Sequence, residues 1–285
     1  MERCRAKGEQ VRVFITGAAG LLGQVLPRAF AAEECYQSTH EQEDIGEPRI
    51  VTTIVNYKPD VIIHAAAMTD VDGCEVQPNV AFRVNEHGTR HVAEAAHRTG
   101  ALLVYVSTDY VYDGTKGTAY IETDPTNPIN VYGRSKLAGE RAAQEAERWL
   151  VVRTSWLYGE GRPNFVTNVL DWIKTQPALR LVWDKQGSPT YVVDLAQAIR
   201  YLVDAGITHE ICHASGEGVC NWVAYGQEIL KITGLQKEIQ PITFDDLQRP
   251  ATRPAHTGLR SAALEKHGFP MRPWQEALRE FLAIL

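Results

Sequence analysis

A tyrosine and a lysine four residues apart form the pair best suited to acid-base chemistry. Tyr132 and Lys136 bracket the segment Tyr-Gly-Arg-Ser-Lys, and this spacing places both side chains on one face of a helix, with Cβ atoms about 6 Å apart. A phenol has a pKa of about 10, so a neighbouring ammonium that favours the phenolate brings that pKa toward neutrality. The pair predicts proton transfer to a developing alkoxide, although a solvent-facing helical pair has the same spacing.

Hydroxyl and carboxyl groups follow the apolar run at residues 101–106. Ser107, Thr108, Asp109 and Tyr110 come directly after it, and ligands in open α/β sheets bind at the carboxyl ends of strands. We therefore predict that Thr108 donates a hydrogen bond to a substrate carbonyl oxygen. A turn or cap built from Ser, Thr and Asp is the alternative.

A glycine-rich turn stands between an expected strand and its helix. Glycines permit a tight turn there and let backbone N–H groups approach a dinucleotide pyrophosphate at the helix N-terminus, although an ordinary turn is the alternative. The predicted cofactor-binding turn comprises Gly17, Ala18, Ala19, Gly20, Leu21, Leu22 and Gly23.

The choice of nicotinamide cofactor depends on the end of the second strand, where an acid binds a ribose hydroxyl and an arginine binds a 2′-phosphate. No Lys or Arg occurs between Ala29 and Pro48, and Glu41 is the acid best placed. This favours NADH, but NADPH stays open. Asp44 and Ile45 are predicted to wrap the adenine.

Alternating elements must position these groups. Short β-branched runs are predicted as strands and amphipathic runs as helices, which is typical of a parallel sheet wrapped by helices. The expected strands are residues 11–16, 36–39, 61–64, 101–106 and 150–154, and the expected helices are residues 21–31, 48–57, 79–99, 131–148, 164–175 and 194–204.

This order predicts an α/β fold with a Rossmann-type doubly wound parallel sheet and a smaller C-terminal substrate lobe. The dinucleotide-binding domain is expected at residues 1–158, with residues 187–209 returning to it. The substrate lobe is expected at residues 159–186 and 210–285, where the β-α pattern loosens.

Composition narrows the partners and the compartment. The 285 residues include 29 basic and 35 acidic ones, with a net charge of -6 and no basic run, so we expect no nucleic acid partner. The longest apolar runs are too short for a membrane span, and Met1–Gln10 does not read as a secretory signal. Five scattered cysteines fit a reducing cytoplasm.

One cluster of histidines and cysteines has a spacing close to that of zinc ligands. His209, Cys212, His213 and Cys220 lie within a dozen residues. Adjacent residues of a strand point to opposite faces, so Cys212 and His213 cannot both bind one ion. We predict no metal at this cluster.

Seven segments together resemble the dTDP-4-dehydrorhamnose reductase family, in the extended short-chain dehydrogenase/reductase superfamily. The likeness covers nearly the whole chain after Val11. The segments are residues 17–23, 65–72, 107–114, 130–140, 153–159, 184–191 and 253–259. Two departures are Tyr112, where the family often has Phe, and Thr257, where it often has Ser.

The resemblance implies roles for particular residues. Thr108, Tyr132 and Lys136 would form the catalytic set, with Tyr132 and Lys136 also touching the cofactor. Asp109 and Trp156 would touch the sugar, to which Trp156 offers a flat apolar wall. The remaining assignments are Ala65, Ala66 and Ala67 along the cofactor, and Arg253 as a diphosphate clamp through its guanidinium.

The implied activity is reduction of the C4 ketone of dTDP-4-dehydro-L-rhamnose by NADPH or NADH, in a homodimer. Some relatives hold magnesium at a subunit contact, but no ligands for it are predicted here. Another nucleotide-sugar 4-ketoreductase or an epimerase remains an alternative. So does a non-catalytic subunit resembling the regulatory subunit of methionine adenosyltransferase, which keeps the Tyr and the Lys.

Overall fold

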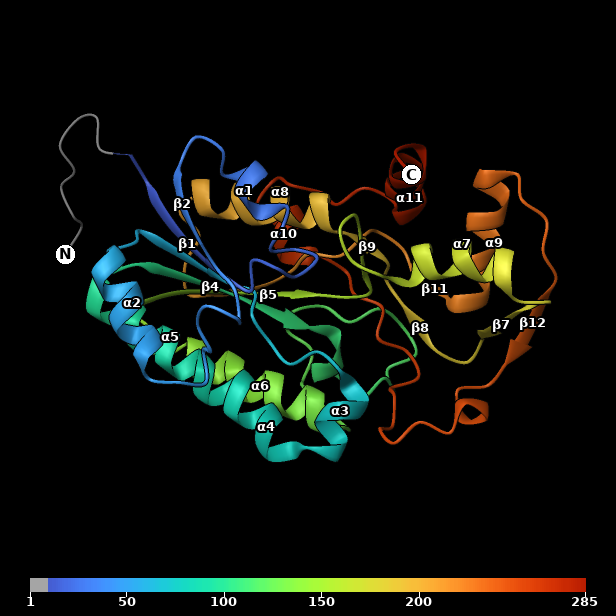
Figure 1. The fold of residues 1–285 in the computed structure, drawn as a ribbon, viewed down its shortest axis with the longest axis horizontal. Coiled ribbons are helices and arrows are strands. Elements are labelled where there is room, and N and C mark those ends of the chain that lie inside the picture. The colour runs from blue at the N-terminus through green and yellow to red at the C-terminus, as the bar shows by residue number, and fades with distance from the viewer. Residues whose placement is uncertain (1–9) are drawn as a thin grey trace.

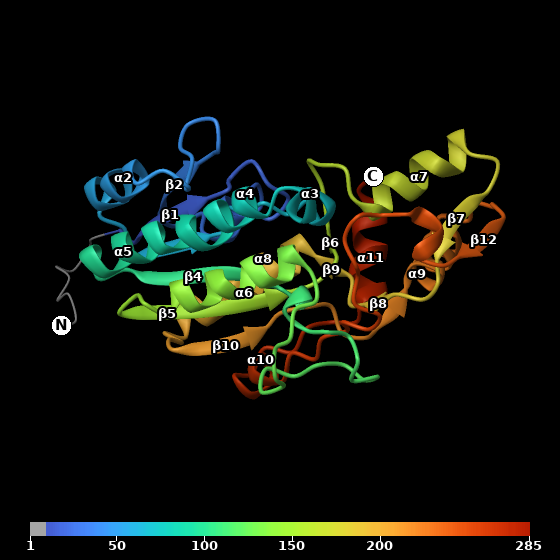
Figure 2. The same ribbon diagram turned by 90° about the horizontal axis from the view of Figure 1, so that it is seen from below.

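A six-stranded parallel sheet forms the centre of the molecule (Figures 1 and 2). The computed structural model describes residues 10–285, so predictions for residues 1–9, including Cys4, lie outside it. The strand order is β10-β5-β4-β3-β1-β2. The strands are β1 (Arg12–Thr16), β2 (Glu34–Ser38), β3 (Val61–His64), β4 (Leu102–Thr108), β5 (Arg148–Thr154) and β10 (Glu210–His213).

Helices cover both faces of this sheet, which confirms the doubly wound prediction (Figure 1). One face carries α2 (Arg49–Tyr57), α5 (Thr89–Thr99) and α6 (Val131–Ala143), and the other carries α1 (Leu26–Ala29), α8 (Val192–Asp204) and α10 (Ala262–Lys266). The chain turns in opposite directions from β1 to β2 and from β3 to β4. This reversal puts the topological switch point between β1 and β3, where ligands bind in such sheets.

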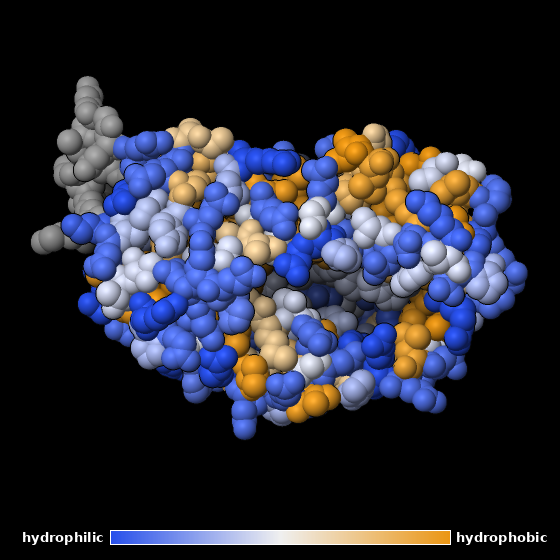
Figure 3. All heavy atoms as spheres, in the orientation of Figure 1, coloured by the Kyte–Doolittle hydropathy of each residue, from blue (hydrophilic) through white to orange (hydrophobic). Residues whose placement is uncertain are grey.

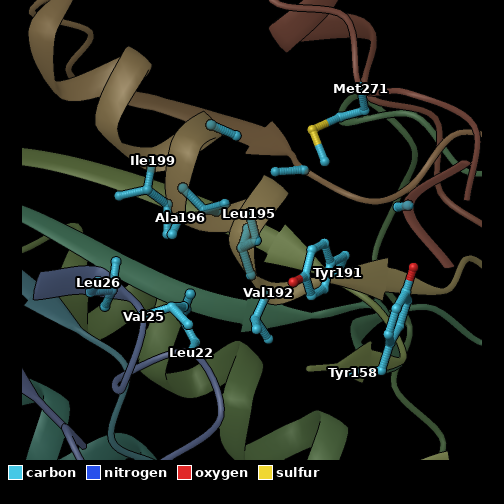
Figure 4. Packing of buried hydrophobic residues seen from close by; sticks show 14 of the residues in the cluster. Leu22, Val25, Leu26, Tyr158, Tyr191, Val192, Leu195, Ala196, Ile199 and Met271 are labelled. Atoms are coloured by element: carbon cyan, nitrogen blue, oxygen red, sulfur yellow. The ribbon is translucent and has the colours of Figure 1, made fainter. Parts of the chain in front are cut away.

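Alternating side chains along the strands feed two separate cores. Val13 and Ile15 of β1 face α1 and α8, whereas Phe14 faces α2 and α5. Figure 4 shows Leu22, Leu26, Val192 and Ile199 in the first of these cores. The inner strands β1, β3 and β4 are buried on both faces, so their runs read as nearly continuously apolar in sequence, whereas the edge strand β2 is partly exposed.

Smaller elements form a second part of the molecule, at the right of Figure 1. They are β6 (Leu157–Tyr158), α7 (Phe165–Thr175), β7 (Leu179–Val182), β8 (Gln186–Gly187), β9 (Thr190–Tyr191), β11 (Cys220–Asn221), α9 (Trp222–Thr233), β12 (Ile239–Ile242), η3 (Asp245–Leu247) and α11 (Trp274–Ala283). We keep the two-lobe division as a proposal. Glu210–His213 nevertheless pairs with β5, on the sheet side of the division.

Two predicted helices are shorter or less regular than expected. The helix predicted at residues 21–31 is regular only over Leu26–Ala29, because Pro27 has no amide hydrogen to donate to the preceding turn. The helix predicted at 79–99 consists of α4 (Pro78–Phe82), a π-helical segment η1 (Arg83–Gly88) and α5. It ends at Gly100, as predicted, with a positive φ.

Other boundaries moved or were missed. The helix α6 ends at Ala143, five residues before the predicted end, because β5 already begins at Arg148. A short helix α3 (Val71–Val76) lies where none was predicted. Within residues 10–285, no helix is both long enough and apolar enough to cross a membrane.

A buried ion pair fastens α6 to the sheet. Glu140 of α6 accepts two hydrogen bonds from Arg153 of β5, at 2.8 and 2.7 Å, and one from Ser107 of β4 at 2.6 Å. The two charged side chains are only 3% and 2% exposed. Such a pair holds its geometry because neither charge has access to water as an alternative partner.

Removing one member of this pair should be strongly destabilising. We expect Glu140→Ala to lower the free energy of unfolding by about 3–5 kcal/mol, because Arg153 would keep an unpaired buried charge. Urea denaturation measures the change. Glu94→Ala, which breaks the exposed pair between Glu94 and Arg98, is the matched control and should change stability little. Equal midpoints for the two variants would contradict the assignment.

Candidate active site

A cavity of about 620 Å³ lies at the carboxyl ends of β1, β3 and β4. Its lining draws on both parts of the molecule, from the glycine turn to Trp156, Leu157 and Pro163. Figure 3 shows the surface hollowed between these parts. The volume is in the range of sites that enclose small molecules and cofactors.

The glycine turn lines this cavity, and its backbone explains the glycines. Gly17 has φ +70°, and a Cβ there would lie 2.7 Å from the backbone nitrogen of Ala66. A Cβ at Gly20 would lie 3.2 Å from the Gly17 carbonyl oxygen, which is a tight contact with backbone. Six of the seven predicted turn residues line the cavity, whereas Ala18 packs into the core beneath it.

The turn and the 65–67 segment therefore fit the diphosphate and ribose parts of a dinucleotide. Ala65, Ala66 and Ala67 line the same cavity. A buried network holds this segment: Thr16 Oγ1 lies 2.7 Å from His64 Nδ1 and accepts a hydrogen bond from the Ala66 N–H at 3.2 Å. Burial lowers the pKa of His64 to about 3, so the imidazole is neutral.

The end of β2 contributes residues that the sequence pattern did not identify. Ser38, Thr39, His40 and Glu43 line the cavity, and Ser38 Oγ donates to Glu43 at 2.8 Å. Glu41, the acid favoured from sequence, is exposed and outside the lining. The strand β2 starts two residues earlier than predicted. Because its bounds were uncertain from sequence, the residues that follow it were not identified as lining residues.

Only one of the two residues predicted to wrap the adenine lines the cavity. Ile45 lines the cavity. The Asp44 carboxylate lies outside the lining, where it pairs with Arg83 at 2.9 Å and accepts from the Gly46 N–H at 2.8 Å. A role for Asp44 toward the adenine stays a prediction.

Thr108, Tyr132 and Lys136 meet in this cavity, as the sequence pattern predicts. Thr108 ends β4, and Asn130 caps α6 by accepting from the Gly133 N–H at 2.8 Å, so both elements present their residues in fixed positions. Lys136 Nζ donates to the Val106 carbonyl at 2.8 Å and lies 4.1 Å from the centre of the Tyr105 ring.

The electrostatics of the pair differ from the sequence-based expectation. Burial raises the pKa of Tyr132, and a hydrogen bond with Thr108 offsets this only in part. Burial also lowers the pKa of Lys136 to about 7, against the opposing effect of Glu140. The pKa of Tyr132 therefore moves in the direction opposite to the predicted lowering, because burial has the largest effect on the phenol. Tyr132 is a neutral phenol, the form that donates a proton.

Asp109 connects Thr108 at the end of β4 to the C-terminal segment. Its side chain is buried and accepts hydrogen bonds from the hydroxyls of Thr257 and Thr108. Burial raises its pKa to about 6, although these hydrogen bonds act in the lowering direction. Thr257 therefore keeps the hydrogen-bonding hydroxyl of the serine that is frequent in the family.

A smaller cavity of about 110 Å³ adjoins the first, and Trp156 lines both. Trp156, held at φ +45°, stacks on Trp222 with ring centroids 3.6 Å apart. Arg253 lines this second cavity and pairs with Asp72 at 3.0 Å. Trp222 and Lys185 also line this cavity, and the sequence analysis missed both. Each is far along the chain from the predicted site residues, and only folding brings them together.

An asparagine in the π-helical segment was also missed. Asn85 is buried, accepts from the Met68 N–H at 2.8 Å, and donates to the Met68 carbonyl at 3.1 Å and to Ser135 Oγ at 2.9 Å. It thus ties the cofactor-side loop to α6. A π-helical turn within a helix is frequent at functional sites, but sequence periodicity gives no signal for it.

Tyr112, the departure from the family's Phe, has a defined role. Its hydroxyl accepts from Arg153 Nη1 at 2.7 Å and lies 2.8 Å from His213 Nε2. Burial lowers the pKa of His213 to about 3, and Nδ1 faces the Arg260 carbonyl at 3.1 Å. We infer that neutral His213 donates through Nδ1, and that the one Tyr112 hydroxyl proton lies between two acceptors, His213 Nε2 and the Ile121 carbonyl at 3.2 Å.

This use of His213 removes it from the cluster with zinc-like spacing. A different trio, Glu210, Cys212 and His267, has possible ligand atoms within 4.8 Å of one another. Glu210 and His267 already pair at 2.8 Å, and burial raises the pKa of the Cys212 thiol to about 12. The trio is explained as a Glu210–His267 hydrogen bond beside a protonated thiol.

The sheet, the glycine turn and the Tyr132–Lys136 pair define a nicotinamide-dependent oxidoreductase of the extended short-chain dehydrogenase/reductase class. Residues 11–285 match the family described as RmlD substrate binding domain. The chain belongs to this family.

Relatives and solved structures agree with this placement. A dTDP-4-dehydrorhamnose reductase of Mycobacterium tuberculosis (strain CDC 1551 / Oshkosh) is 40% identical, over 97% of this chain and 94% of that protein. The spore coat polysaccharide biosynthesis protein SpsK of Bacillus subtilis (strain 168) is 37% identical, over 95% and 96%. The crystal structure of dTDP-4-dehydrorhamnose reductase from Bacillus anthracis str. Ames in complex with NADP has a TM-score of 0.93, 35% identity, and coverage of 97% and 100%.

The pKa of Asp109 predicts a pH-dependent stability. The pKa of Asp109 in the folded state, about 6, exceeds the roughly 3.9 of an exposed aspartate. Its contribution to the free energy of unfolding is therefore complete below pH ~4 and is lost as the pH rises through ~6. Relative to the parent, Asp109→Asn should therefore gain about 2 kcal/mol of unfolding free energy between pH 4.5 and 7.5.

Urea denaturation at the two pH values tests this. Asp113→Asn is the control, because hydrogen bonds from Thr115 hold the pKa of Asp113 below its usual range. Its titration falls below this window, so its difference from the parent should stay flat. A flat difference for Asp109→Asn as well would contradict the shift.

Proposed function

We propose that this protein reduces the C4 ketone of dTDP-4-dehydro-L-rhamnose to dTDP-L-rhamnose, using NADPH or NADH. The observation that carries the proposal is the position of the catalytic group. Thr108, Asp109, Tyr132 and Lys136 line the large cavity, and Trp156 is shared with the smaller one. A dinucleotide on one side and a sugar on the other would meet at this group.

The residues divide the chemistry as follows. The bound cofactor supplies the hydride. The Thr108 hydroxyl, whose one proton is donated to Asp109 in this structure, would turn that proton to the carbonyl oxygen and polarise it. Neutral Tyr132 donates the proton that the oxygen needs as the ketone becomes an alcohol. Lys136, one helical turn along, stabilises the phenolate that remains and also binds the nicotinamide ribose.

The smaller cavity has the chemistry of a nucleotide-sugar site. Trp156 and Trp222 offer a stacked apolar surface for a ring. Lys185 and Arg253 bring positive charge to the same lining, suited to a diphosphate. Trp156, Asp109 and Arg253 are therefore the proposed substrate-binding residues.

Two further features belong to the proposal. The described cysteines are free thiols, which supports a reducing cytoplasmic location. We propose a homodimer from the family resemblance, which size-exclusion chromatography with light scattering would test. The name of the B. subtilis relative, a spore coat polysaccharide biosynthesis protein, supports a place in the synthesis of cell-surface polysaccharide.

The first experiment follows oxidation of NADPH and of NADH by absorbance as the purified protein meets dTDP-4-dehydro-L-rhamnose. Rapid oxidation with either cofactor is the expected result. No oxidation despite dinucleotide binding would favour another nucleotide sugar or a non-catalytic subunit. A cofactor that stays bound through purification would favour an epimerase.

Removing the phenolic hydroxyl should abolish turnover selectively. We expect Tyr132→Phe to lower kcat about 10²- to 10⁴-fold, because the general acid is lost. The dissociation constant for NADPH, measured by calorimetry, should stay nearly unchanged. Tyr36→Phe, which removes a hydroxyl from β2 outside the cavity lining, should keep full activity. Equal rates for both variants would exclude Tyr132 as the acid.

A further inference from the structure

A segment of the second part of the molecule lies over the glycine turn. Residues 159–163 follow β6, and three contacts join them to the first βα unit. Glu160 pairs with Arg28 at 3.6 Å, and Arg162 Nη1 donates to the Ala19 carbonyl at 3.0 Å. Gly161 has φ +88°, and any Cβ there would collide with the Gln24 side chain. The segment thus rests directly on the predicted pyrophosphate turn.

Asn164 fixes the backbone of this segment. It is 7% exposed, and its Nδ2 donates to the Gly159 carbonyl at 2.7 Å and to the Arg162 carbonyl at 3.0 Å. Its Oδ1 accepts from the Val166 and Thr167 N–H groups at the start of α7. With every polar atom of Asn164 in use, Arg162 is presented from a rigid backbone.

Arg162 is also a distinctive charge in the large cavity. It is the single arginine among the described residues that line this cavity. An arginine stays charged at any physiological pH, whereas burial brings the pKa of Lys136 to about 7. The Arg162 side chain is exposed, and its bond to Ala19 uses one of the five N–H donors of a guanidinium.

We propose that Arg162 binds the diphosphate of the nicotinamide dinucleotide, closing the glycine turn from the opposite side. This inference rests on the proposed use of such a cofactor. The turn supplies backbone N–H groups but no charge, and Arg162 supplies the countercharge with planar, bidentate geometry. Its bond to Ala19 places it on the turn itself, whereas a 2′-phosphate would lie at the end of β2, near Ser38 and Thr39.

Calorimetric titration of the full-length protein tests the assignment without turnover. The ligands are NADH, NADPH and ADP-ribose, which share the diphosphate. Arg162→Ala should weaken all three about tenfold, because a charged hydrogen bond is lost at a partly solvated site. Arg162→Lys should recover part of the loss, since it keeps the charge without the bidentate geometry. Wild-type affinity should also fall more steeply with added salt than that of Arg162→Ala.

Arg28→Ala is the matched control. It removes an arginine that touches the same segment through Glu160 but lies outside the cavity lining, so all three affinities should remain at wild-type values. Unchanged affinities in Arg162→Ala would overturn the proposal. So would a loss confined to NADPH, which indicates the 2′-phosphate, or a loss that spares ADP-ribose, which indicates the nicotinamide side. Wild-type protein that binds none of the three would overturn the proposed function itself.

Discussion

The buried pair between Glu140 and Arg153 is the interaction on which the site depends. It joins α6, which carries Tyr132 and Lys136, to the strands whose ends carry Thr108 and the cavity floor. Both charges are sealed from water, so each needs the other and the position of α6 is narrowly set. The same carboxylate acts on Lys136 one turn away and raises its pKa against the effect of burial. Glu140 thus anchors α6 and keeps Lys136 protonatable near neutral pH.

Burial pushes the ionisable groups of the site toward their neutral forms. The pKa values of Tyr132 and Asp109 rise, and that of Lys136 falls to about 7. In a site with a low dielectric constant, a charge that develops on a substrate interacts more strongly with nearby charges and dipoles than it would in water. A neutral phenol is the correct starting form for reduction, since the ketone must gain a proton. For an oxidising direction the same burial would be unfavourable, because the base would have to be a phenolate.

The sequence predicted the parts of the fold that depend on local pattern. The strands, the glycine turn and the Tyr132–Lys136 spacing are short-range signals, and the structure brings them to one cavity. Residues that act across long separations had no such signal. Arg162 meets Ala19 over 143 residues of chain, and Trp222 meets Trp156 only through folding. The effect of Lys136 on Tyr132 also failed as a prediction, because spacing gives proximity but not the degree of desolvation.

The large cavity is lined by both parts of the molecule rather than by the Rossmann-type sheet alone. The sheet supplies the glycine turn, and the chain then returns after β5 to lay residues 159–163 across it. That segment continues directly into α7 through the Asn164 cap, and α7 packs on α9, which carries Trp222 at its start. The segment on the glycine turn and the wall of the smaller cavity are therefore connected through the packed pair α7 and α9.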